Sequence, residues 1–272
     1  MGSVARLEAR LRELGRVLVA FSGGADSAFL LAAAARTLGP ESVVAATAVS
    51  ASLPASELGP AADFAASLGV RHLTPGTEEM AREGYRANGA DRCFFCKAEL
   101  LDVLTPLADS LAIPFVATGT NADDAVAGFR PGIRAAAERG AVTPLLDAGL
   151  TKAEIRATSR EWGLATWDKP AAACLSSRIA YGIEVTPRRL GRVEQAEASL
   201  RHALLTSGIA VRDLRVRDVG DVARVEVDRD LVPELAARPD LLAVVTGFDA
   251  VELDGRGFRS GSMNEALAAA PE

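Results

Sequence analysis

Apolar and polar positions along this chain follow two different spacings. Short apolar runs, typical of buried strands, lie at 17–21, 42–49, 70–74 and 115–118. Stretches with apolar residues three or four apart, typical of helices, lie at 7–14, 57–68 and 97–111, and the stretch 28–35, rich in alanine and leucine, is also typical of a helix. Strands that alternate with helices predict an α/β fold with a parallel sheet and helices on both faces. Because such sheets bind ligands at the carboxyl ends of their strands, the loops after the strands are the candidate sites.

The pattern changes near residue 180. The stretch 181–187 contains glycine and proline and is typical of a linker. The elements expected beyond it are a helix over 188–205, a hairpin of 214–217 and 222–227, a helix over 231–242 interrupted by a proline, and a strand over 250–253. We therefore expect two domains, 1–180 and 181–272, of which the second is a smaller α+β domain.

Charged residues alternate with apolar ones in the predicted hairpin. Leu214 and Val216 face one way and Arg215 and Arg217 the other, because side chains alternate along a strand. Glu226 lies on the partner strand. Two interpretations remain open: a solvated sheet face with a cross-strand ion pair, or an arginine clamp for a phosphate or carboxylate.

The segment 22–27, Ser-Gly-Gly-Ala-Asp-Ser, separates the first strand from a long helix. An anion at a helix N-terminus gains hydrogen bonds from N–H groups that lack partners and stabilisation from the helix dipole. Gly23 and Gly24 let the backbone approach an oxygen closely, while Ser22 and Ser27 add hydroxyl donors. The loop is neither G-x-x-x-x-G-K-[ST] nor G-x-G-x-x-G. The alternative to a phosphate site is a plain turn with Asp26 or Ser27 as the N-cap.

Two carboxylates follow the strand at 115–118. Asp123 and Asp124 can hold magnesium near a phosphate loop, although Asp123 can equally cap the next helix. Gly119, directly after the strand, would let the backbone lie against a flat base.

The three cysteines suggest metal or thiol chemistry. Cys93 and Cys96 form a Cys-x-x-Cys pair, and Cys174 lies in a turn-rich segment far along the chain. A four-ligand zinc site would need a further ligand, and neither His72 nor His202 has ligand spacing. Three thiolates on an iron–sulfur cube would leave one iron open to an exogenous ligand. A cluster, a thiol or persulfide pair, zinc and inert burial all remain open.

Composition narrows the class of function. The chain has 272 residues, 49% of them hydrophobic, and a formal net charge of −6. Its apolar runs are far shorter than the roughly 20 residues of a membrane helix, and the acidic balance disfavours binding to a nucleic-acid backbone. No apolar signal core follows Met1, so we expect a cytoplasmic protein that acts on a small molecule without nucleic acid or membrane.

The loop at 22–27 resembles the pyrophosphate loop of the N-type ATP pyrophosphatases. The whole chain resembles the LarE family, ATP-dependent sulfur transferases that make the nickel-pincer cofactor of lactate racemase. The segments that carry this resemblance are 22–27, 47–54, 92–97, 119–124, 130–134, 150–156, 167–178, 215–217, 223–227 and 259–265.

The resemblance implies an adenine-nucleotide α-hydrolase-like fold and a reaction on pyridinium-3,5-dicarboxylic acid mononucleotide. ATP would adenylate a carboxylate and release pyrophosphate, and sulfur would then displace AMP to give a thiocarboxylate. Cys174 matches the sulfur-donating cysteine, which in some members loses its own sulfur. Members that also carry the pair matching Cys93 and Cys96 are thought to bind a [4Fe-4S] cluster with a transferable sulfide. The implied cofactors are thus ATP, Mg²⁺ and a [4Fe-4S] cluster, and the family suggests a homo-oligomer such as a hexamer.

The resemblance also assigns residues to roles. The expected cluster ligands and catalytic residues are Cys93, Cys96 and Cys174. The expected nucleotide and magnesium contacts are Ser22, Gly23, Gly24, Asp26, Ser27, Ala48, Gly119, Asp123 and Asp124. The expected contacts to the mononucleotide are Ser177, Arg178, Arg215, Arg217 and Arg259. The rival interpretations are a transfer-RNA thiolase of the same superfamily, a sacrificial single-cysteine donor without a cluster, and a regulatory module that binds ATP or AMP.

Overall fold

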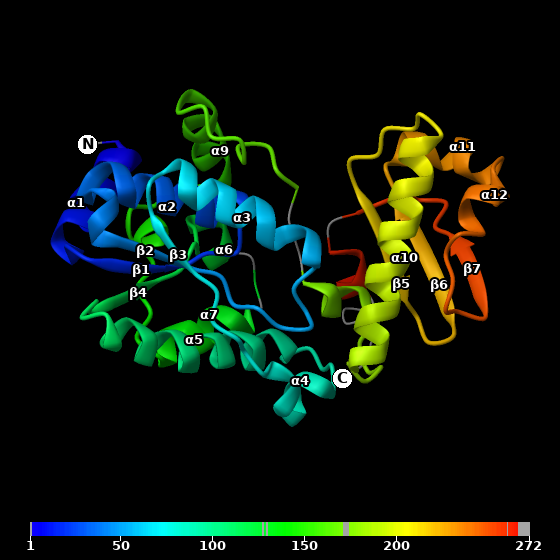
Figure 1. Ribbon diagram of the computed structural model, residues 1–272, viewed down its shortest axis with the longest axis horizontal. Coiled ribbons are helices and arrows are strands. Elements are labelled where there is room, and N and C mark those ends of the chain that lie inside the picture. The colour runs from blue at the N-terminus through cyan, green and yellow to red at the C-terminus, as the bar shows by residue number, and fades with distance from the viewer. Residues whose placement is uncertain (1, 127, 129, 171–173, 260, 266–272) are drawn as a thin grey trace. The chain divides into compact units, whose positions relative to one another are not determined.

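The computed structural model of the protein describes residues 2–126, 128, 130–170, 174–259 and 261–265 (Figure 1). The chain divides into two compact units. The first comprises Met1–Arg82 and Asp91–Ala172, and the second Glu83–Ala90 and Ala173–Glu272. The sequence places its boundary near residue 180. The observed division lies a few residues earlier, and a short segment from the first half of the chain belongs to the second unit.

The first unit is built on a four-stranded parallel sheet with the order β3-β2-β1-β4. The strands are β1 (Val17–Ala20), β2 (Val43–Ala46), β3 (Arg71–Leu73) and β4 (Phe115–Ala117). Val17 pairs with Val43 on one side and with Phe115 on the other. This confirms the parallel sheet expected from the sequence, although β2 ends three residues before the predicted strand does.

Helices cover both faces of this sheet, as expected (Figure 1). Val17 and Val19 pack with α1, α2 and α3 on one face, whereas Leu18 packs with α5 and α7 on the other. The split follows from the alternation of side chains along a strand. The helices are α1 (Ser3–Leu14), α2 (Ala25–Leu38), α3 (Ala55–Ser67), α5 (Arg92–Ser110) and α7 (Pro131–Glu138).

Three further helices belong to the described part of the first unit. They are α6 (Ala122–Val126), α8 (Pro144–Asp147) and α9 (Lys152–Glu161). The sequence pattern Thr151-x-x-Glu154 predicts a capping box at α9, and the structure confirms it. The Glu154 N–H donates to Thr151 Oγ1 over 3.3 Å, and the Thr151 N–H donates to Glu154 Oε2 over 2.9 Å.

The second unit contains a three-stranded sheet with the order β5-β6-β7, in which β5 and β6 are antiparallel. The predicted hairpin and the last predicted strand are thereby confirmed. Its main elements are α10 (Pro187–Thr206), β5 (Leu214–Asp218), β6 (Val222–Val227), α11 (Val232–Ala236), α12 (Pro239–Leu242) and β7 (Ala250–Leu253). Side chains of α10, such as Leu200 and Leu204, pack against Val216 and Val225 in its core.

Asn88 ties the segment Glu83–Ala90, which contains α4 (Glu83–Arg86), into the second unit. Asn88 is fully buried and adopts φ 55°, a left-handed conformation that asparagine tolerates better than most residues. Its Nδ2 donates to the carbonyl oxygens of Ala180 and Ile183, each over 2.8 Å. The Gly182 N–H donates to the Asn88 carbonyl over 3.1 Å. A single buried side chain therefore joins two distant parts of the sequence.

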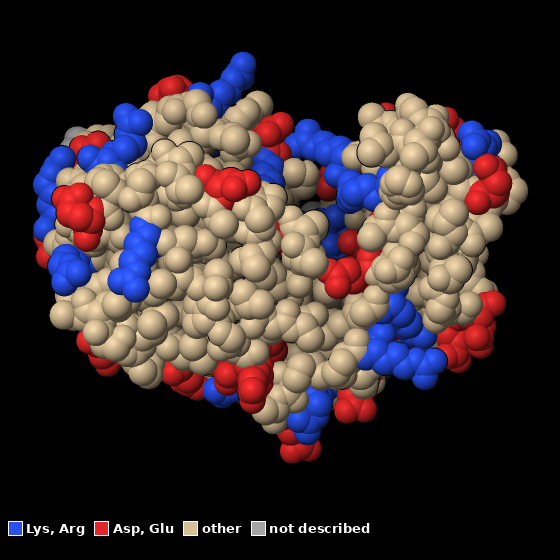
Figure 2. Space-filling model, viewed as in Figure 1, with Lys and Arg blue, Asp and Glu red and all other residues tan. Residues whose placement is uncertain are grey.

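On the face of the first unit in view in Figure 2, basic and acidic residues are interspersed on a mostly neutral surface. Among the helices that the structure describes, none is long and apolar enough to cross a membrane.

Candidate active site

The loop 22–27 connects β1 to α2 and gathers its hydroxyl groups at one point. Ser22 Oγ lies 3.1 Å from Ser27 Oγ, and the Gly24 N–H donates to Ser22 Oγ over 3.4 Å. Gly24 is the N-cap of α2, so the alternative that Asp26 or Ser27 caps this helix is wrong. Both residues lie in the first turn, where the helix N–H groups and the hydroxyls of Ser22 and Ser27 form an environment suited to an anion.

Gly23 is required by both conformation and space. Its φ is +71°, and a Cβ at this position would lie 3.4 Å from the Ala61 Cβ of α3. A larger residue would strain the backbone and press the loop against α3.

Asp26 and Asp124 are joined through Asn121, which is fully buried. Asn121 Nδ2 donates to Asp26 Oδ2 over 3.1 Å, and the Asp124 N–H donates to Asn121 Oδ1 over 3.1 Å. Lys152 Nζ donates to Asp124 Oδ1 over 2.9 Å. Burial raises the pKa of Asp26; the positive charge of Lys152 opposes this rise and the negative charge of Asp124 adds to it. Two carboxylates near an anion site are suitable ligands for Mg²⁺.

Asp123 has a different role from its neighbour. It lies inside α6, and its Oδ2 accepts a hydrogen bond of 2.7 Å from the Lys152 N–H at the first residue of α9. The sequence leaves open whether Asp123 binds magnesium or caps the helix that follows it. The structure instead shows it bonded to the N-terminus of α9, a partner 29 residues away that no local pattern indicates.

We expect Asp26→Asn to raise the thermal stability of the ligand-free protein at pH 8. Because burial raises the pKa of Asp26 above its unfolded value, the folded state binds more protons between the two pKa values. The free-energy cost of burying the ionised Asp26 carboxylate is therefore absent at low pH and complete above the pKa of Asp26 in the folded state. Asparagine carries no charge and avoids this cost. The stabilisation should shrink as the pH falls towards 4, about the pKa of an unperturbed aspartate.

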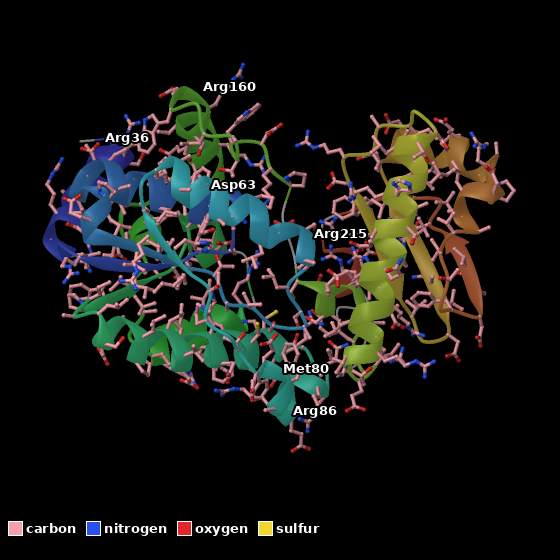
Figure 3. The ribbon with its side chains drawn as sticks, viewed as in Figure 1. Arg36, Asp63, Met80, Arg86, Arg160 and Arg215 are labelled. Atoms are coloured by element: carbon pink, nitrogen blue, oxygen red, sulfur yellow. The ribbon has the colours of Figure 1, made fainter. Side chains whose placement is uncertain are left out.

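Trp162 and Trp167 are the two tryptophans of the chain, and both belong to the first unit. Tryptophan fluorescence can therefore follow the thermal unfolding of this unit, with EDTA present to keep the protein free of metal ions. Asp63→Asn on α3 is the matched control, because Asp63 is exposed (Figure 3). A lower melting temperature for Asp26→Asn at pH 8 would contradict the prediction.

Gly119 and Ala48 both follow strand ends. A Cβ on Gly119 would lie 3.0 Å from the Ser27 backbone nitrogen, so the glycine allows close packing against the start of α2. Packing within the protein thus explains the glycine, and the contact with a base stays a prediction. Ala48 is half-buried just after β2.

Cys93 and Cys96 lie in the first two turns of α5, whereas the sequence pattern places them before the helix. Their spacing of three residues puts both on one face of the helix. Cys93 is exposed, Cys96 is half-buried, and neither forms a disulfide. The pKa of Lys97 is lowered by burial, and the negative charges of Cys96 and Cys93 act against this shift. Thiol groups on one helix face are soft donors of the kind that bind metals.

Cys174 belongs to the second unit, and its backbone is held tightly. Its carbonyl accepts hydrogen bonds from the Ser177 N–H at 3.0 Å, Ser177 Oγ at 2.7 Å and Arg178 Nη1 at 3.1 Å. The Cys174 sulfur lies 3.0 Å from the hydroxyl of the buried Ser176. Ser177 and Arg178, expected to contact substrate, therefore also position Cys174. Among the described residues no three His, Cys, Asp or Glu side chains form a metal-binding group, and a cluster bound by all three cysteines stays a prediction.

The arginines of the hairpin are buried, so the interpretation of a solvated sheet face is wrong. All of β5 is buried, including Arg215 at 8% and Arg217 at 5% exposure. The cross-strand ion pair itself is present: Arg217 Nη2 donates to Glu226 Oε2 over 2.8 Å. The two residues are diagonal neighbours, because the register places Arg224 opposite Arg217.

Arg178, Arg215 and Arg217 form an arginine cluster in the second unit. Arg178 makes two hydrogen bonds to Glu197 of α10, of 2.9 and 3.1 Å. Arg215, labelled in Figure 3, lies 5.2 Å from the centre of the Phe258 ring. Burial lowers the pKa of Arg215, and the charges of Arg178 and Arg217 lower it further, so an added anion would be stabilised here.

Arg259 has other partners, Asp254 and Glu265. Its expected role in substrate binding stays a prediction.

Comparison with known proteins identifies the family. No protein-family model matches the chain. An uncharacterised protein of Synechocystis is 42% identical over 260 residues, 94% of this chain and 94% of that protein. The pyridinium-3,5-bisthiocarboxylic acid mononucleotide synthase of Lactiplantibacillus plantarum is 32% identical over 269 residues, 98% of this chain and 95% of the synthase. The chain belongs to the LarE family. This LarE-family chain is also 29% identical to an uncharacterised protein of Methanocaldococcus jannaschii over 144 residues, 53% of this chain and 54% of that protein.

In this LarE-family chain the structure adds residues that sequence patterns alone did not single out. Asn121 links Asp26 and Asp124, Glu197 holds Arg178, and Lys169 contacts the loop 22–27. Each acts through a partner distant in sequence, so no local periodicity could have indicated it.

Proposed function

We propose that this LarE-family chain is an ATP-dependent sulfur transferase. It adenylates the carboxylates of pyridinium-3,5-dicarboxylic acid mononucleotide and converts them to thiocarboxylates. The observation that carries the proposal is the similarity over 98% of the chain to a synthase named for the bisthiocarboxylic product. The loop 22–27 and the arginine cluster support the proposal as candidate sites for the nucleotide and for the substrate.

The activation step belongs to the first unit. A substrate carboxylate oxygen attacks the α-phosphorus of ATP, the bond to the bridging oxygen breaks, and pyrophosphate leaves. The N–H groups and hydroxyls of the loop 22–27 bind this leaving group and stabilise its charge. Asp26 and Asp124 would hold Mg²⁺, which neutralises charge on the phosphates when bound.

The mononucleotide is bound by the second unit. Its phosphate needs cationic donors in a dry environment, and Arg215 and Arg217 are both more than nine-tenths buried. Glu226 holds Arg217 in place, and Phe258 supports Arg215.

The sulfur step uses the cysteines. A sulfur anion attacks the carbonyl carbon of the acyl adenylate, and AMP leaves with the electron pair of the broken carbon–oxygen bond. Cys93, Cys96 and Cys174 would hold a [4Fe-4S] cluster, because their thiols are soft donors and none is in a disulfide. When bound, such a cluster supplies an open iron for an exchangeable sulfide. The alternative is that Cys174 gives up its own sulfur.

The test is anaerobic incubation of the full chain with ATP, Mg²⁺, sulfide and the dicarboxylic mononucleotide. We expect pyrophosphate release and a thiocarboxylate product detected by mass spectrometry. Nicotinamide mononucleotide, which has no carboxylate, is the control and should give neither. Pyrophosphate release without thiocarboxylate, or none at all, would contradict the proposal. Iron and sulfide bound after reconstitution support the cluster, whereas conversion of Cys174 to dehydroalanine after turnover would identify it as a sacrificial donor.

A further inference from the structure

The chain uses lysine at only three of its 30 basic positions. Lys97, Lys152 and Lys169 all belong to the first unit. Lys97 neighbours the cysteine pair, Lys152 pairs with Asp124, and Lys169 contacts the loop 22–27. An ammonium group is a compact charge with donors in three directions, whereas guanidinium is a planar fork. Of the three, Lys169 donates a hydrogen bond to the backbone of the loop 22–27 in the described part of the chain.

Lys169 makes two hydrogen bonds through Nζ. One is to the carbonyl oxygen of Gly23, over 3.1 Å, and the other to Glu57 Oε2 of α3, over 2.7 Å. Lys169 and Glu57 are each only 22% exposed. Arg156 of α9 donates from Nη2 to the Lys169 carbonyl over 3.2 Å, which fixes the lysine backbone. The Lys169 ammonium is therefore held at the loop by Glu57 of α3, and the Lys169 backbone is held by Arg156.

The contact with Gly23 orients the peptide that follows. The Gly23 carbonyl and the Gly24 N–H belong to one planar trans peptide, in which they point in opposite directions. With the carbonyl held by Lys169, the N–H is directed to Ser22 Oγ, 3.4 Å away, and so towards the hydroxyls of Ser22 and Ser27. Because the flanking residues are glycines, little else restricts rotation of this peptide.

We propose that Lys169 is a positioning residue for the pyrophosphate portion of ATP. It holds the Gly23–Gly24 peptide so that the Gly24 N–H faces the bound phosphates, and Glu57 keeps the ammonium in place. The loop 22–27 itself has no lysine, unlike a P-loop. Lys169, which contacts the loop backbone, is 146 positions from Gly23 in the sequence. The inference rests on the proposed use of ATP.

The test compares binding of pyrophosphate and of AMP, each with Mg²⁺, to the full chain by calorimetry. We expect Lys169→Met to weaken pyrophosphate and ATP about tenfold or more, as for loss of a charge-assisted hydrogen bond, and to change AMP binding less than about twofold. A merely structural role would weaken all three ligands alike. Arg12→Met, which removes an exposed cation from α1, is the charge control and should change none of them.

Glu57→Gln distinguishes a Lys169 that positions the Gly23–Gly24 peptide from a Lys169 that contacts the phosphates directly. It also provides a test if Lys169→Met fails to fold. If Lys169 acts through Gly23, loss of its anchoring carboxylate should leave pyrophosphate binding equal or weaker. If the ammonium instead binds the phosphates itself, its release from Glu57 should tighten binding, and that result would overturn the inference. Unchanged pyrophosphate affinity in Lys169→Met would also overturn it. Failure of the unmodified chain to bind ATP or pyrophosphate would remove the proposed function and this inference together.

Discussion

Replacing Cys174 by alanine is expected to abolish thiocarboxylate formation while ATP binding and substrate-dependent pyrophosphate release continue. The two half-reactions separate because the loop 22–27 lies in the first unit and Cys174 in the second. The attacking group must be an anionic sulfur, and alanine offers none and cannot hold one.

The substitution should leave the local structure intact. The three hydrogen bonds at Cys174 are made to its backbone carbonyl, and alanine retains that carbonyl. Alanine removes the contact between Ser176 Oγ and the sulfur.

Pyrophosphate release and product mass should be measured on the same sample. Ser176→Ala is the matched control: it removes the neighbouring hydroxyl and keeps the sulfur, so the reaction should slow without stopping. If Cys174→Ala still forms thiocarboxylate, another residue delivers the sulfur.

Asp218→Ala is expected to destabilise the second unit by about 3–5 kcal/mol, the usual effect of breaking a buried ion pair by removing one partner. Asp218 is fully buried at the end of β5. Its Oδ1 accepts from Arg189 Nη1 at 2.8 Å and Arg192 Nη2 at 2.7 Å, and its Oδ2 accepts from Arg192 Nε at 2.9 Å. The Gly220 N–H in the hairpin turn also donates to Oδ1, over 3.1 Å. Alanine would leave two guanidiniums and a turn N–H without this acceptor.

The aromatic residues allow each unit to be followed separately in urea. Tyr85 and Tyr181 are the two tyrosines, and both belong to the second unit, whereas both tryptophans belong to the first. The tyrosine absorbance transition should shift to lower urea. Asp240→Ala is the control, because its pair with Arg238 is exposed and solvent screening leaves such a pair little effect on stability. A tyrosine transition unchanged by Asp218→Ala would contradict the prediction.

Local patterns predicted much of the architecture correctly. The parallel sheet, the helices on its two faces, the capping box at α9 and the β5–β6 hairpin follow from periodicity and turn residues, because one-sided burial imposes a regular spacing on nearby positions. The helix boundary at the cysteine pair was missed. Charged and aromatic residues in the first turn of α5 obscure the helical spacing there.

For the site, local patterns were enough to identify the loop 22–27, the three cysteines and the alternation of arginines in the hairpin. The partners of these groups are seen in the folded chain. The tertiary structure joined Lys169 to Gly23, Asp123 to the start of α9, and Arg178 to Glu197. It also made the arginine face of β5 a buried one. The physical reason is that spacing reports which side of an element is buried, whereas the partner of a charge depends on where the chain returns after many residues.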